Sequence, residues 1–143
     1  MVVIAVVAGF VGIISVPFAV VAKIPVRPSW RGAVFTSVPS LGMLILFYSL
    51  AVHMYQTLGS WPTSIGERGF PTHLVTHALI AVEYSIAIAL GTVFGGPLVL
   101  MACLARPSWR PLVRYLYLHV LLLGGCWLLM QLAPAEFLYW WRD

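Results

Sequence analysis

The sequence predicts an all-α integral membrane protein, with four transmembrane helices arranged as two parallel-repeated helical hairpins and followed by a short interfacial C-terminal helix. Its 143 residues are 62% hydrophobic and only 8% charged. A soluble domain carries about 25% charged residues, so this chain has too few charges to cover a water-exposed surface. Disorder is also excluded, because disordered chains combine low hydrophobicity with high charge.

Four apolar runs are long enough to cross a bilayer, whose hydrocarbon core of about 30 Å needs about 20 helical residues. They are Val2 to Ala22, Ala33 to Met54, His77 to about Leu104, and Tyr115 to Leu132. Helices are expected, because a backbone in lipid must satisfy its hydrogen bonds internally. A cleaved signal peptide begins with a positively charged region, and no basic residue precedes the first run. We therefore expect the first run to stay in the mature protein as a transmembrane helix.

Basic residues cluster between the first and second runs and between the third and fourth. They are Lys23, Arg27, Arg31, Arg106, Arg110 and Arg114. The remaining loop has only Arg68, beside Glu67. The positive-inside rule therefore predicts that both basic loops are cytoplasmic and both termini outside, in a bacterial inner membrane. We expect Arg27, Arg31, Arg106 and Arg110 to contact lipid head groups rather than nucleic acid.

A five-residue motif occurs twice, as Arg27-Pro28-Ser29-Trp30-Arg31 and as Arg106-Pro107-Ser108-Trp109-Arg110. We interpret the copies as a duplication within one membrane domain, residues 1–143, with repeat 1 at about 1–61 and repeat 2 at about 80–140. Repeats of two helices keep the same direction, so an axis along the membrane normal would relate the hairpins. The alternative is that the motif arose independently in two cytoplasmic turns, because the same residues suit both.

Small residues and prolines predict how the helices pack. Gly91 and Gly95 form a GxxxG pattern, which allows two helices to approach closely in lipid. We therefore expect Gly91 to be buried against another helix, either of this chain or of a partner. Pro17 and Pro97 predict kinks in the first and third spans.

The tail from Ala133 to Asp143 predicts a short helix on the outer surface, with Pro134 in its first turn. Tyr139, Trp140 and Trp141 suit a membrane–water interface. The same aromatic residues could instead form a contact surface for a partner subunit.

Glu83 is the only acidic residue inside a predicted span. A carboxylate is costly in lipid, so we expect Glu83 to be buried in the protein or to face a wet cavity. Two roles are open, a structural carboxyl or a proton, ion or ligand site. Its leading single partner is His53, the nearby group able to carry positive charge; the alternative is a hydroxyl, such as that of Tyr48 or Ser49, or a backbone donor.

His53, His73 and His77 gather toward the predicted outer side. They could be solvated or bonded to loop carbonyls, hold b-type haem or a chlorophyll, or bind one metal ion. His119 lies toward the other end of the fourth span with no second histidine at its depth.

The sequence lacks a phosphate-binding loop and the common zinc and redox motifs, and its loops are short. We therefore expect no enzymatic activity. The leading hypothesis is a non-catalytic accessory subunit of a larger respiratory or photosynthetic membrane complex. The alternatives are a small haem- or chlorophyll-binding protein that uses the outer histidines, and a transporter or channel with Glu83 in its pathway.

Overall fold

The computed structural model describes residues 29–62 and 69–142, and within these ranges the chain is helical without β-strands. Three helical segments are long and apolar enough to cross a membrane, at Trp30–Leu58, Thr72–Ala105 and Pro107–Met130. The all-helical prediction and three of the predicted spans are confirmed. The predicted span from Val2 to Ala22, together with Arg27, lies outside the described residues, and the two-hairpin repeat stays a prediction.

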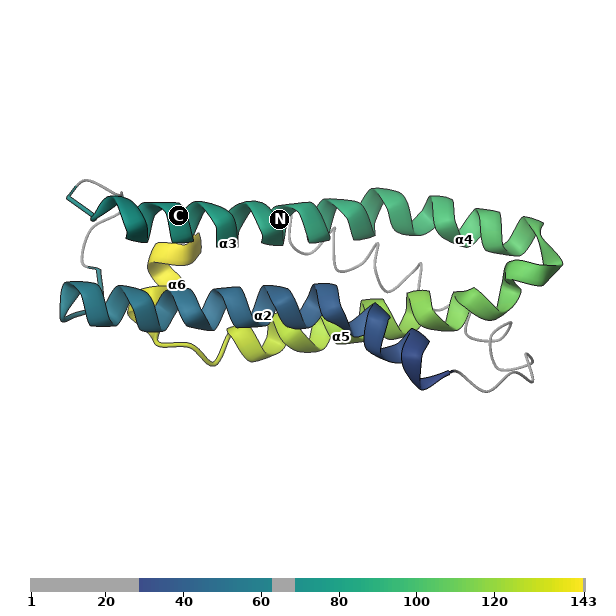
Figure 1. Cartoon of the computed structure of the whole chain (residues 1–143), viewed down its shortest axis with the longest axis horizontal. Coiled ribbons are helices and arrows are strands. Elements are labelled where there is room, and N and C mark those ends of the chain that lie inside the picture. The colour runs from purple at the N-terminus through teal and green to yellow at the C-terminus, as the bar shows by residue number, and fades with distance from the viewer. Residues whose placement is uncertain (1–28, 63–68, 143) are drawn as a thin grey trace.

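The helices follow one another in a simple order along the chain. They are α2 (Trp30–Leu58), α3 (Thr72–Leu90), the π-helical segment η1 (Gly91–Gly95), α4 (Gly96–Ala105), the 3-10 segment η2 (Pro107–Leu112), α5 (Val113–Met130) and α6 (Ala135–Arg142). In Figure 1, α3 and α4 form one long rod that lies beside α2 and α5. The short α6 lies across the end where α2 finishes and α3 begins.

The two motif copies fold differently. Ser29 is the N-cap of α2, and its Oγ accepts a hydrogen bond of 3.1 Å from the backbone N–H of Gly32. The residue equivalent to Gly32 in the second copy is Pro111, which has no N–H to donate. The second copy therefore lacks this cap and forms the 3-10 turn η2 before α5 begins.

Both copies nevertheless lie at the same end of the bundle. The backbone N–H of Ser29 donates to Oη of Tyr115 at 2.8 Å, and the Ser29 hydroxyl lies 3.1 Å from the same oxygen. Tyr115 is in the first turn of α5, directly after the second copy. The side of the membrane on which this end lies stays a prediction.

The π-helical segment interrupts the longest helix. Pro97 follows it in the first turn of α4, and a proline inside a helix removes one N–H donor and crowds the carbonyl four residues earlier. The wider turn of Gly91–Gly95 gives that carbonyl more room. Where the sequence predicted a kink, the structure has this local widening.

Aromatic side chains close the end of the bundle that α6 covers. Phe47 and Phe137 are both fully buried, with ring centroids 5.0 Å apart. Trp61 and Trp140, at equivalent positions of the two predicted repeats, each lie 6.0 Å from the Phe137 ring. The predicted C-terminal helix is thus present, but it packs into the core as well as presenting the exposed Tyr139.

The close approaches between helices occur at glycines other than Gly91. A Cβ atom at Gly91 would meet nothing within 4 Å, and the residue is exposed. None of the described helices buries Gly91, and its burial against a partner stays a prediction. At Gly32 a Cβ would lie 2.6 Å from the Tyr115 ring, and at Gly42 it would lie 2.8 Å from Oη of Tyr84.

Candidate functional site

Three histidines meet where α2 packs against the beginning of α3. Nδ1 of His53, from α2, lies 2.9 Å from Nδ1 of His77, from α3. The His73 ring stacks on His53 with centroids 5.2 Å apart and an interplanar angle of 28°. The spacing of His73 and His77 puts both on the same side of α3. The sequence-based expectation that these three side chains gather is met in the structure.

The direction of the hydrogen bonds in this cluster follows from one hydroxyl. Ser49 donates its single hydrogen to the carbonyl of Leu46 at 3.0 Å, so Oγ accepts from Nε2 of His77 at 3.1 Å. A neutral His77 then has an unprotonated Nδ1. Consequently Nδ1 of His53 donates to His77, and Nε2 of His53 remains an acceptor.

This arrangement does not fit a haem held by His53 and His77. Axial nitrogens lie on opposite faces of the iron, about 4 Å apart, with the porphyrin between the rings. The facing nitrogens of His53 and His77 are 2.9 Å apart and in direct contact. Haem ligation by His53 with His73, and ligation of a chlorophyll by one of the three histidines, stay predictions. Across residues 29–62 and 69–142, no group of three or more His, Cys, Asp or Glu side chains is placed to hold a metal ion.

Glu83 lies on the outer surface of α3 and does not join this cluster. Its side chain is exposed among the described residues, so none of them supplies the burial that the sequence predicted. His53 pairs with His77 instead of Glu83. Among the described residues, Glu83 makes neither a hydrogen bond nor an ion pair. The mistake came from assuming that an intramembrane carboxylate must be satisfied within its own chain.

His119 forms a second polar contact, deeper in the bundle. Its Nε2 lies 2.9 Å from Oγ1 of Thr92, in the π-helical segment. His119 lies midway along the span Pro107–Met130 rather than toward its end, because the helical segment begins before Tyr115. Sequence reasoning missed Thr92, whose hydroxyl was one of several within the apolar runs.

The arginines near the motif copies stack on neighbouring tryptophans. The guanidinium carbon of Arg31 lies 5.8 Å from the Trp30 ring centre, and that of Arg106 lies 4.7 Å from the Trp109 ring centre. Arg106 and Arg110 are exposed. Stacked, exposed cations beside aromatic rings suit a membrane surface; contact with lipid head groups stays a prediction.

Comparisons of this chain with protein families, with curated proteins and with solved structures found no match.

Proposed function

We propose that this chain is a non-catalytic subunit of a larger membrane assembly, and that the surface of α3 around Glu83 contacts another subunit. The observation that carries the proposal is an exposed carboxylate on an otherwise apolar helix. The assembly we propose is of the respiratory or photosynthetic electron-transport type. This part of the proposal rests on composition, because the chain is apolar throughout and has short loops.

The neighbours of Glu83 on the surface are large and apolar. Leu79, Ile80 and Ile86, one turn before and after it, are 50%, 52% and 51% exposed. Ala87, also one turn after Glu83, is small and exposed, which would let a second helix approach closely. In all, the segment Thr72–Ala105 buries little of its surface within the chain.

The depth of Glu83 makes an exposed position costly. The segment Thr72–Ala105 has 34 residues, and at about 1.5 Å per residue it is about 50 Å long. If the segment is centred on a core of about 30 Å, Glu83 lies about 6 Å inside the hydrocarbon. A charged side chain facing lipid within a helix costs a few kcal/mol. A donor from a neighbouring subunit would remove this cost.

Purification from the native membrane in mild detergent, followed by native mass spectrometry, tests the proposal. The wild-type chain is expected to co-elute with larger subunits at fixed stoichiometry. Glu83→Leu should reduce the bound fraction at least tenfold, because truncating one member of a buried charged contact costs about 2–5 kcal/mol. The matched control Gln56→Leu replaces an exposed polar side chain of α2 and should leave the assembly intact.

Two results would overturn the proposal. One is a wild-type chain that elutes alone. The other is a Glu83→Leu variant that assembles as well as wild type. Glu83→Leu should not weaken folding of the chain, because Glu83 has no partner among residues 29–62 and 69–142. Loss of assembly with unchanged thermal unfolding would therefore report on the interface.

The geometry favours the two alternatives less. A haem held by His53 and His77 conflicts with the direct contact between them. A transport pathway through Glu83 would need the carboxylate to line a cavity, and Glu83 is not among the described residues that line the groove between α2, the α3–α4 rod and α5.

A further inference from the structure

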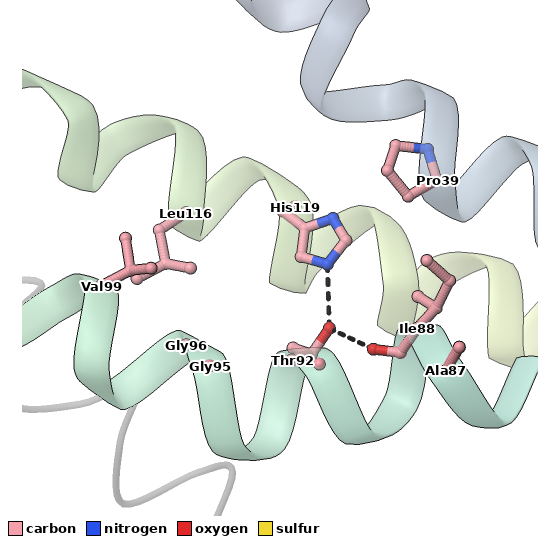
Figure 2. Close-up of a pocket in the computed structure, with 10 residues that line it drawn as sticks. Pro39, Ala87, Ile88, Thr92, Gly95, Gly96, Val99, Leu116 and His119 are labelled. Carbon is pink, nitrogen blue, oxygen red and sulfur yellow. Dashed lines mark hydrogen bonds between the residues drawn. The ribbon is translucent and has the colours of Figure 1, made fainter.

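A groove of about 270 Å³ lies between α2, the α3–α4 rod and α5, and neither the three clustered histidines nor Glu83 is among the residues that line it. Figure 2 shows Pro39 on one side of it, Leu116 and His119 on α5, and Thr92 with the neighbouring glycines on the rod. The lining is apolar apart from Thr92 and His119. A polar pair at mid-depth in a membrane protein is costly and commonly marks a functional site.

The hydrogen bonds of Thr92 determine which nitrogen of His119 is free. Thr92 donates its single hydrogen to the carbonyl of Ile88 at 2.7 Å. Its Oγ1 must therefore accept from Nε2 of His119 at 2.9 Å. A neutral imidazole then carries no hydrogen on Nδ1, which is an acceptor. In Figure 2 this second nitrogen lies on the side of the ring toward Pro39.

The floor of the groove is bare backbone. Gly91 and Gly95 both line it, and a Cβ at either position would meet none of the described residues within 4 Å. Both residues belong to the π-helical segment, a feature that is rare and frequent at functional sites. A surface of this kind accommodates a flat group, which can lie against the backbone without meeting side chains.

We propose that this groove binds a lipid-soluble phenol or hydroquinone, whose ring lies on the glycines and whose hydroxyl donates to Nδ1 of His119. An apolar cavity of about 150 Å³ holds benzene, while pockets for drug-sized ligands begin near about 300 Å³. The volume of about 270 Å³ therefore suits one substituted ring. A quinone or an aryl ether has only acceptor oxygens, so neither can satisfy this acceptor nitrogen.

A matched pair of probes tests the proposal on the purified full-length chain. 4-tert-Butylphenol and its methyl ether differ in the hydroxyl hydrogen, and their saturable binding can be compared by titration calorimetry in detergent. The phenol is expected to bind about three- to tenfold more tightly, the range expected for one hydrogen bond. In ¹⁵N-histidine spectra, the Nδ1 signal of His119 should shift on adding the phenol and stay unchanged with the ether.

Two variants test separately the surface that binds the ring and the hydrogen bond to the hydroxyl. Gly95→Leu should fold normally, because its side chain enters open space, and it should abolish binding of both probes. His119→Phe should bind both probes equally. Should His119→Phe fail to fold, the ¹⁵N shift in wild type still decides the question.

Several outcomes would overturn the inference: no saturable phenol binding, equal affinity of wild type for the two probes, or unchanged binding by Gly95→Leu. None of these measurements involves a partner subunit. The inference and the proposed function can therefore fail independently.

Discussion

Gly32→Ala is expected to destabilise the chain, because α2 and α5 approach each other closely at this glycine. The new Cβ would lie 2.6 Å from Cε1 and Cζ of Tyr115, whereas ordinary contact begins at 3.4 Å. The Tyr115 ring would have to retreat from Gly32, and so from α2, by about 0.8 Å. That movement breaks the 2.8 Å bond from the Ser29 N–H and the 3.1 Å contact with its hydroxyl.

The net cost follows from three contributions. Overpacking costs about 1–3 kcal/mol, and each lost hydrogen bond costs about 0.5–1.5 kcal/mol, toward the lower end where water can replace it. Alanine recovers about 1 kcal/mol of helix propensity relative to glycine. We therefore expect Gly32→Ala to lower the free energy of unfolding by about 2 kcal/mol.

Equilibrium unfolding in mixed micelles, driven by sodium dodecyl sulfate and followed by circular dichroism, measures this change. Gly91→Ala is the matched control, because among the described residues its Cβ would meet nothing within 4 Å. Only the gain in helix propensity then applies, so we expect it to raise the free energy of unfolding by up to about 1 kcal/mol. Equal destabilisation by the two variants would refute the packing assigned to Gly32.

Three further predictions concern buried contacts. Ser40→Ala should raise the free energy of unfolding by about 1 kcal/mol in the same assay, because the Ser40 hydroxyl is buried without a hydrogen-bond partner; a loss of stability would contradict this. Gly42→Ala should cost about 1 kcal/mol through the 2.8 Å contact with Oη of Tyr84, and much less in a Tyr84→Phe background; additive effects in the double-mutant cycle would argue against the contact. His53→Phe should lower the free energy of unfolding by about 1 kcal/mol, because it removes the hydrogen bond between the Nδ1 atoms of His53 and His77; unchanged stability would count against the paired geometry.

The long apolar runs predicted the helices because hydrophobicity and length alone decide that a segment spans lipid. The same runs could not predict where helices touch. Gly91 and Gly95 carry a common packing pattern, yet the close contacts are at Gly32 and Gly42, since Tyr115 and Tyr84 happen to face them. Which aromatic ring opposes a glycine depends on the register between helices, which one sequence does not contain.

The sequence predicted which histidines form the candidate site, but it did not predict the hydrogen bonds between them. Placing His53 at the end of one span and His77 at the start of the next was enough to bring them together. The 2.9 Å contact between their Nδ1 atoms depends on side-chain geometry and on Ser49. The position of Glu83 was mistaken because burial was judged for a single chain, whereas an intramembrane carboxylate can be covered by a second protein.

Site-specific photo-cross-linking in the native membrane tests most directly whether the face around Glu83 contacts a protein. A photoreactive residue at Ile86, one turn from Glu83, is compared with one at Leu128 on α5, which is 63% exposed. We predict one discrete adduct from position 86, larger than the chain alone, and lipid adducts only from position 128. Lipid adducts alone from position 86, or a cross-link that stays within the chain, would contradict the proposal that this chain is a subunit docked through α3.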